Sequence, residues 1–301
     1  MKGEKVLKIA VGFVHGIGKQ HPDFYLGMAA ALERRLAEVC PEVELVPEGI
    51  YWADITDNLE KKLQEKLSPY HLRWDNIIDA RGFMINFVGD AIAYQPLPKI
   101  DDPAPKEYIY TDIHERFALK LQSLAHQAGP DAPLCLISHS LGTIITSNYL
   151  YDLQNGKIPP RIRGIIDKSN TPLERGETLT HLYTMGSPIA LWTLRYHDFG
   201  KPISVPAMNL RGQEIGEWVN FYDKDDVIAY PIKILSEQYD EVVKDDIEVR
   251  NPGLLSGTPL GSHGGYYHSD EVIERIVQSL AEMYNKITSQ HDIAAAKTTA
   301  S

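Results

Sequence analysis

The segment from Pro133 to Ile145 reads PLCLISHSLGTII and joins a short apolar run to a helix-like repeat through a serine turn. The run PLCLI is typical of a strand that is buried on both faces of a parallel sheet. From Ser140 to about Leu153 the apolar residues recur at helical spacing. A serine at such a strand-to-helix turn projects its hydroxyl above the end of the sheet, so Ser140 is a candidate nucleophile.

This turn departs at one place from the G-x-S-x-G pattern of such serines. Gly142 occupies the second glycine position, whereas Ser138 replaces the first glycine with another small residue. A competing interpretation makes Ser140 only the N-cap of the helix, where serine is also favoured. The strand–turn–helix context favours the nucleophile, and we expect the neighbouring His139 to point into the fold.

Strand-like and helix-like segments alternate along the rest of the chain, which predicts an α/β fold with a mostly parallel central sheet flanked by helices. Pro47 lies inside the second strand-like segment and predicts an edge strand or a bulge there. The other expected strands are Lys8–Val14, Val43–Trp52, Leu179–Met185 and Trp218–Tyr222, and the expected helices centre on residues 25–39, 113–124 and 272–283.

The length of 301 residues allows one large domain or two small ones. We expect a single domain over residues 1–288, because Ile17 near its start and His263 near its end are both candidates for one site. Residues 55–105 interrupt the alternation and predict a helical insertion or cap, which could act as a lid. Residues 289–301 have no core pattern and predict a flexible tail.

Composition excludes several classes of protein. The chain has 30 Lys and Arg residues against 41 Asp and Glu, a net charge of −11, which argues against binding to nucleic acids or anionic membranes. Its two cysteines, Cys40 and Cys135, cannot build a disulfide framework or a four-thiolate zinc site. No run reaches the roughly 18–20 apolar residues of a transmembrane segment. We expect a cytoplasmic protein and, as a first hypothesis, an enzyme.

A glycine-rich turn, HGIG, follows the first strand. Acyl transfer by a serine needs two backbone N–H donors that face the developing oxyanion. One usually belongs to the residue after the nucleophile and the other to a glycine-rich loop after an earlier strand. We therefore expect Leu141 and Ile17 to be these donors. The residues expected to support them are His15, Gly16, Gly18 and Gly142.

The same turn has a competing interpretation as a phosphate-binding loop of a dinucleotide site. Gly16 and Gly18 match the first half of G-x-G-x-x-G, but His21 stands at the third glycine position. This interpretation also leaves the serine turn unexplained, so the dinucleotide site is the weaker hypothesis.

A nucleophilic serine needs a histidine base and a carboxylate that orients it, and in this type of fold the chain order is Ser, Asp or Glu, then His. Asp223, Asp225 and Asp226 directly follow the strand WVNFY. We favour Asp226, which precedes two β-branched residues, with Asp223 as the alternative. Among the later histidines we favour His263 in the loop GSHGGYYH, with His268 as the alternative.

Five short segments in this order resemble the α/β-hydrolase superfamily, and within it the bacterial lipase- and esterase-like serine hydrolases: VHGIGKQ, ISHSLGT, YTMGSP, DKDDV and SHGGYYH. The resemblance implies hydrolysis of a carboxylic ester through an acyl-enzyme on Ser140. It implies Asp226 as the acid, His263 as the base, and Ile17 and Leu141 as oxyanion donors. No metal ion or organic cofactor is implied.

The expected partner is a small-molecule ester, or an acyl lipid if the insertion is a lid. The acidic chain should favour neutral esters unless its charge lies far from the site. A second hypothesis is a non-catalytic protein that keeps the fold for binding. The oligomeric state does not follow from the sequence.

Overall fold

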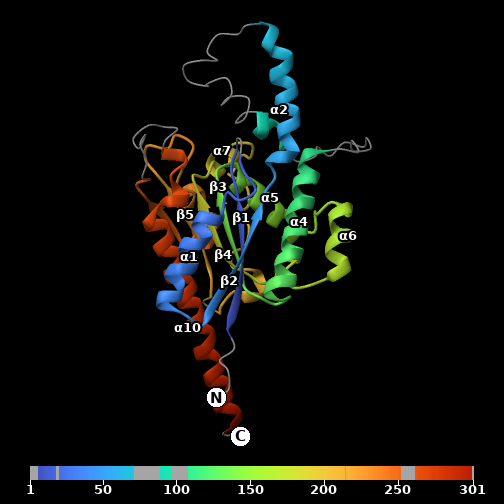
Figure 1. Ribbon diagram of the computed structural model, residues 1–301. Coiled ribbons are helices and arrows are strands. Elements are labelled where there is room, and N and C mark those ends of the chain that lie inside the picture. The colour runs from blue at the N-terminus through green and yellow to red at the C-terminus, as the bar shows by residue number, and fades with distance from the viewer. Residues whose placement is uncertain are drawn as a thin grey trace.

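The structure is a computed structural model that describes residues 6–17, 20–70, 89–95, 108–213, 215–251 and 262–299. At its centre lies a six-stranded sheet in the order β2-β1-β3-β4-β5-β6 (Figure 1). Every neighbouring pair of these strands is parallel, which confirms the predicted parallel sheet. The strands are β1 (Leu7–Val14), β2 (Val43–Ile50), β3 (Leu134–His139), β4 (Leu179–Met185), β5 (Glu217–Tyr222) and β6 (Asp245–Glu248).

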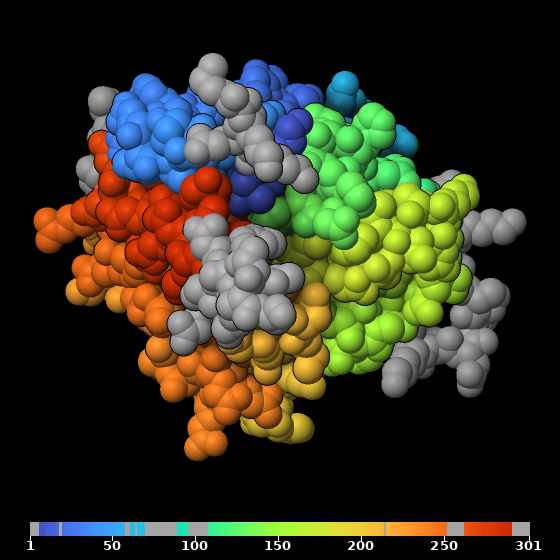
Figure 2. Space-filling view, turned by 90° about the horizontal axis from the view of Figure 1, so that it is seen from below, coloured from blue at the N-terminus to red at the C-terminus, as the bar shows by residue number. Residues whose placement is uncertain are grey.

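Helices cover both faces of the sheet, which is why the central strands β3 and β4 are buried along their whole length. Val11 and Phe13 of β1 belong to a core packed by α1 (Leu26–Val39) and α10 (Asp270–Thr299). Ala10 and Val14 belong to the core on the other face, packed by α4 (Ile109–Ala128), α5 (Leu141–Gln154) and α6 (Pro160–Ser169). Seen from below, blue α1 lies on the red side of the molecule and green α4 beside yellow-green α6 on the other (Figure 2).

The remaining elements lie in the connections between these strands and helices. They are α2 (Ala53–Leu67), η1 (Ser68–Tyr70), α7 (Ile189–Thr193), η2 (Met208–Leu210), η3 (Lys233–Leu235), α8 (Glu237–Val242) and η4 (Tyr266–His268). In the part of the chain that the structure describes, no helix is long and apolar enough to cross a membrane.

The sequence signals one edge strand of the sheet, β2, but not the strand at the other edge, β6. Pro47 lies in β2, which forms one edge and pairs only with β1, as expected for a strand that contains proline. The other edge is β6, a short acidic strand (DDIE) that the apolar patterns do not predict. At the C-terminus α10 continues to Thr299, so it includes most of the segment expected as a tail. The flexibility of that segment stays a prediction.

The expected insertion is described only in part. Helix α2 starts just after β2 and projects beyond the carboxyl edge of the sheet (Figure 1). Residues 71–88 and 96–107, which make up most of the rest of the insertion, lie outside the described residues. The single domain over 1–288 and the lid therefore stay predictions.

The strand order places a topological switch point between β1 and β3. From β1 the chain goes to β2 on one side and then crosses to β3 on the other, so the connections diverge at this point. In open parallel sheets, ligands bind at the carboxyl ends of the strands at such a switch point. Gly16 follows β1 and Ser140 follows β3, so both lie at this switch point.

Candidate active site

Ser140 occupies a sharp turn between β3 and α5. Its backbone has φ 53° and ψ −130°, a conformation that is rare for any residue other than glycine. Neighbouring bonds hold it there: the Ser140 N–H donates to the carbonyl of Met185 (2.9 Å), and the Thr143 hydroxyl donates to the Ser140 carbonyl (2.7 Å). Strained conformations of this kind persist where the surroundings over-determine them, and they cluster at functional sites.

A chain of hydrogen bonds joins Ser140 to two side chains from distant loops. The Ser140 Oγ lies 2.7 Å from Nε2 of His263, and His263 Nδ1 lies 2.8 Å from Oδ2 of Asp226. Because a carboxylate only accepts, the proton of the imidazole lies on Nδ1, and Nε2 is left to accept from the serine hydroxyl. The structure thus brings together the three side chains that the sequence singled out.

The carboxylate of Asp226 is buried and accepts three hydrogen bonds. Besides His263, the hydroxyl of Tyr266 donates to Oδ2 (2.9 Å) and the backbone N–H of Ile228 donates to Oδ1 (3.0 Å). Burial raises the pKa of this carboxyl, but the bonds from His263, Ile228 and Tyr266 together outweigh burial and lower the pKa below its ordinary value. Asp226 is therefore charged at neutral pH.

The two alternative residues lie outside this chain of bonds. Both carboxylate oxygens of Asp223 accept from backbone N–H groups, those of Asp225 (2.9 Å) and Asn251 (2.8 Å). Asp223 therefore fixes the loop that carries Asp226 and does not bind the imidazole of His263. His268 is exposed at the end of η4 and has no described contact with Ser140.

Glycines allow the backbones around Ser140 to approach closely. A Cβ on Gly16 would lie 2.5 Å from the Cβ of Ser140, and one on Gly142 would lie 2.4 Å from the carbonyl oxygen of His15. As the first residue of α5, Leu141 has no intrahelical acceptor for its N–H. Gly18 lies outside the described residues. The roles of Ile17 and Leu141 as oxyanion donors stay predictions.

His15 fixes the first turn as a neutral side chain. Its Nε2 accepts from the backbone N–H of Trp52 (3.0 Å), its Nδ1 donates to the carbonyl of Gly16 (2.7 Å), and its ring stacks on the Trp52 indole. Burial lowers the pKa of His15 to about 4. The next helix, α1, begins only at Leu26, so this turn does not lead into a helix N-terminus as a dinucleotide-binding loop does.

His139 is buried, as expected, and it contacts the candidate base. Its Nε2–H donates to the backbone carbonyl of His263 (2.7 Å), and the two rings lie 4.8 Å apart. Burial lowers the pKa of His139 to about 3, so the ring is neutral beside His263. Gly186 makes this packing possible: it has φ 57°, and a Cβ there would lie 3.2 Å from both His139 Nε2 and Asp226 Oδ2.

Ser138, which replaces the first glycine of the serine motif, packs onto α5. Its hydroxyl lies 2.7 Å from that of Thr146, and both residues are buried. A second hydroxyl pair links Thr143 to Ser187 at 2.9 Å, and Ser187 also accepts from the N–H of Ile189. Hydroxyl contacts thus take the place of the absent glycine in holding strand, helix and turn together.

Sequence patterns did not indicate every residue that shapes the site. The bond from Tyr266 to the acid and the bond from Ser187 to Thr143 join segments whose spacing gives no sign of contact. The contact between His139 and His263 spans 124 residues of sequence. Only the short motifs YTMGSP and SHGGYYH pointed to the segments concerned. Among the described residues no group of His, Cys, Asp and Glu side chains could hold a metal ion.

No protein-family model matches the chain, and neither does any curated protein. The chain is similar in structure to an esterase from the fungus Rhizomucor miehei, with 13% identity and a TM-score of 0.44 over 95% of this chain and 78% of that one. It is also similar to a Pyrobaculum calidifontis esterase, with 10% identity and a TM-score of 0.39 over 94% of this chain and 78% of that one. A third similar structure is Est1E from Butyrivibrio proteoclasticus, with 11% identity and a TM-score of 0.40 over 94% of this chain and 90% of that one. With TM-scores below 0.5 these likenesses carry no argument about activity.

The chain's own architecture decides the fold. A parallel sheet in the order β2-β1-β3-β4-β5-β6 carries a serine turn at its switch point and has helices on both faces. The chain has an α/β-hydrolase fold. The fold expected from the sequence is therefore confirmed.

Proposed function

We propose that this protein is a serine hydrolase that cleaves a carboxylic ester through an acyl-enzyme on Ser140. The observation that carries the proposal is the unbroken hydrogen-bond chain from Ser140 Oγ through His263 to Asp226. Nucleophile, base and orienting acid in hydrogen-bond contact are the arrangement that acyl transfer by serine requires. A small-molecule ester is the proposed substrate.

In the first step the Ser140 oxygen attacks the ester carbonyl while His263 Nε2 takes the hydroxyl proton. The resulting imidazolium is stabilised by the charge of Asp226, whose pKa is low enough to keep it ionised. The carbonyl oxygen becomes an oxyanion and accepts from the N–H groups of Ile17 and Leu141. The C–O bond then breaks, and His263 returns its proton to the departing alcohol.

In the second step water attacks the acyl-enzyme, and His263 takes a proton from that water. Collapse of the second tetrahedral intermediate breaks the bond to Ser140, which regains its proton from His263. The net reaction consumes one ester and one water and yields one carboxylic acid and one alcohol. Neither step requires an oxidant, a reductant or a further co-reactant.

Ser140 is buried, and His263 is only 8% exposed. Helix α2, at the start of the insertion at 55–105, projects beyond the carboxyl edge of the sheet, where Ser140 lies (Figure 1). This placement is the observation in favour of the proposed lid.

A fluorophosphonate probe tests the proposal directly, because it reacts with activated serines. We expect the wild-type protein to be labelled on Ser140, with Ser140→Ala and His263→Gln unlabelled. A matched control is Ser289→Ala, which removes an exposed serine of α10 and should still be labelled. Wild-type protein without label, or equal labelling of Ser140→Ala, would refute a serine hydrolase and favour a binding protein on the same fold.

A further inference from the structure

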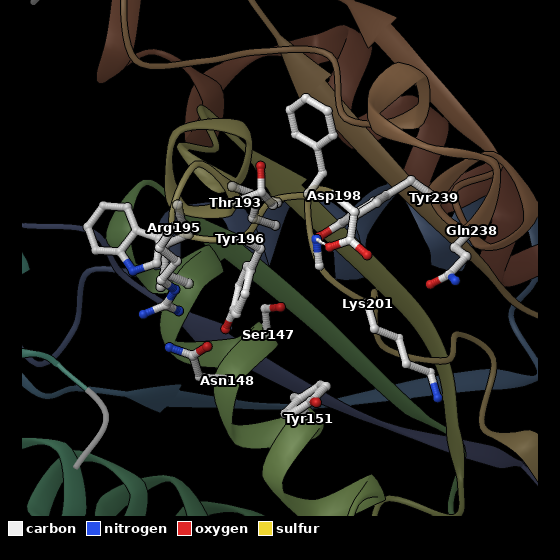
Figure 3. Close-up of a pocket in the computed structure, with 15 residues that line it drawn as sticks. Ser147, Asn148, Tyr151, Thr193, Arg195, Tyr196, Asp198, Lys201, Gln238 and Tyr239 are labelled. Carbon is white, nitrogen blue, oxygen red and sulfur yellow. Dashed lines mark hydrogen bonds between the residues drawn. The ribbon is translucent and has the colours of Figure 1, made fainter. Parts of the chain in front are cut away.

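A cavity of about 330 Å³ lies beside the helix that starts at the serine turn. It is enclosed by α5, by α7 and the segment after it, and by the start of α8 (Figure 3). From α5 it takes Ile144, Ser147, Asn148 and Tyr151, which share one face of the helix. Ser140 is the N-cap of this helix, four residues before Ile144, and Asn148 lies about 12 Å further along the helix axis.

The inner end of the cavity adjoins the serine turn through α7. Ile189, which lines the cavity, is the first residue of α7. Its N–H donates to the Ser187 hydroxyl, which bonds to Thr143, and Thr143 in turn donates to the carbonyl of Ser140. We therefore expect an acyl chain held at Ser140 to run along α5 toward this cavity, past Ile144 and Ile189, which line it.

The cavity walls combine a largely aromatic surface with two cations. Arg195 and Lys201 line it, and neither forms an ion pair with a described residue; Arg195 instead lies over the ring of Tyr196 (5.3 Å). The one carboxylate in the lining is that of Asp198, which accepts from the N–H of Gly200 (3.3 Å). The remaining aromatic lining residues are Tyr151, Trp192, Phe199 and Tyr239.

A buried amide donor lies at the same end of the cavity as Arg195. Asn148 and Arg195 are neighbours in Figure 3, with Lys201 toward the opposite end. The Asn148 amide nitrogen is buried and lies beside the Tyr94 hydroxyl. Arg195 is exposed and is therefore the group at this end of the cavity that a ligand can reach.

We propose that this cavity binds an anionic group, such as a carboxylate, at the far end of the ester substrate. The inference rests on the proposed function, because it assigns the substrate class of the same serine. The lining carries a net charge of +1 in a chain whose net charge is −11. Since exposed charges are screened beyond about 8–10 Å, the local cations decide which ligand is attracted. The preference for neutral esters expected from the net charge is therefore reversed at this cavity.

Two series of 4-nitrophenyl esters test the proposal. One series carries a terminal carboxylate on acyl chains of four to ten carbons, and the other carries a primary amide of matching length. We expect wild-type kcat/KM to favour the carboxylate by about tenfold at the best chain length, which is the typical effect of one charge-assisted hydrogen bond. The preference should shrink as salt is raised.

Substitutions at Arg195 test whether the preference for the carboxylate ester arises in the cavity. Arg195→Gln is expected to lower kcat/KM for the carboxylate ester about tenfold more than for the amide ester, mainly through KM. Arg195→Glu should instead favour the ester of matching length with a terminal ammonium group. Lys168→Gln is the matched control: it removes an equal charge from an exposed position in α6 and should leave the carboxylate-to-amide ratio unchanged.

The experiments distinguish a wrong assignment of the anion subsite from a wrong assignment of the protein as a hydrolase. Labelling of Ser140 by the phosphonate probe, together with equal kcat/KM for carboxylate and amide esters at every length, overturns the subsite alone. A preference that persists in both Arg195 variants overturns it as well. Absence of labelling and of hydrolysis for both series overturns the proposed function itself.

Discussion

Two buried histidines in this protein have the same kinds of neighbours but differ in geometry. His263 has the hydroxyl of Ser140 at Nε2 (2.7 Å) and the carboxylate of Asp226 at Nδ1 (2.8 Å). His114 in α4 has the hydroxyl of Tyr94 at Nε2 (2.7 Å), but the carboxylate of Asp152 lies 3.9 Å from Nδ1. A hydroxyl, an imidazole and a carboxylate in one cluster are therefore not enough to make a triad.

The electrostatics of the two clusters differ in the same way. Burial raises the pKa of Asp152, although the bond from Tyr110 opposes this shift, and burial lowers the pKa of His114 to about 3. At Asp226 three hydrogen bonds outweigh burial, and the pKa falls. The His263 cluster thus stabilises a charged acid beside the imidazole, whereas the His114 cluster holds a neutral imidazole.

The largest expected difference follows from replacing the two imidazoles. On the proposed mechanism, His263→Gln should lower kcat for a 4-nitrophenyl ester about 10⁵–10⁶-fold, the loss typical of removing the histidine of a catalytic triad. His114→Gln should leave the reaction within a few-fold of wild type, because His114 is not in contact with Ser140. A large loss of kcat in folded His114→Gln would contradict this distinction.

The carboxylates provide the next comparison. Asp226→Asn keeps the size of the side chain but removes the charge that stabilises the imidazolium, so we expect kcat to fall about 10⁴-fold. Asp152→Asn removes a carboxylate that bonds to Tyr110 and should affect stability more than kcat. Circular dichroism and steady-state rates on the same preparations separate the two effects. Similar losses of kcat in both variants would show that Asp226 acts only in folding.

Much of this arrangement could be predicted from the sequence, for a physical reason. Residues at the carboxyl ends of parallel strands meet at one edge of the sheet, so the apolar run before Ser140 and the strand before Asp226 locate both residues. The second strand could be assigned to the edge because Pro47 lacks an N–H for a second partner. These inferences use only local pattern and chain order.

Contacts between loops could not be predicted in this way. The bond from His139 to the backbone of His263 depends on how a loop folds back across the sheet edge, and no periodicity records it. The same holds for the cluster around His114, which joins α4 and α5 to Tyr94 of the insertion. Strand β6 was missed because its sequence has no apolar repeat.

The His114 cluster should also affect stability as a function of pH. The pKa of His114 is about 3 in the folded protein and 6.5 in the unfolded chain, so the unfolded state binds more protons between these values. The resulting stability is fully present above pH 6.5 and is lost as pH falls toward 3. For this residue alone the free energy of unfolding should fall by about 2 kcal/mol from pH 7 to pH 5.

Urea unfolding at both pH values measures this effect. Other buried histidines contribute to the wild-type slope, so the informative quantity is the difference between wild type and His114→Gln. The variant should lose about 2 kcal/mol less than wild type between pH 7 and pH 5. An unchanged slope would mean that His114 becomes protonated within the fold without penalty.

The smallest expected difference concerns the two tyrosines that donate to the carboxylates. Tyr266 donates to Asp226 (2.9 Å) and Tyr110 donates to Asp152 (2.8 Å), so the two bonds are alike in length. Tyr266→Phe removes one of three donors to the acid, which raises the pKa of Asp226 and loosens its hold on His263. We expect kcat to fall about tenfold, the loss typical of one hydrogen bond to a charged group.

Tyr110→Phe removes an equivalent bond at a carboxylate that takes no part in the proposed reaction, so kcat should change less than twofold by the same reasoning. If both variants lowered kcat equally, the difference between the clusters would lie in packing rather than in charge.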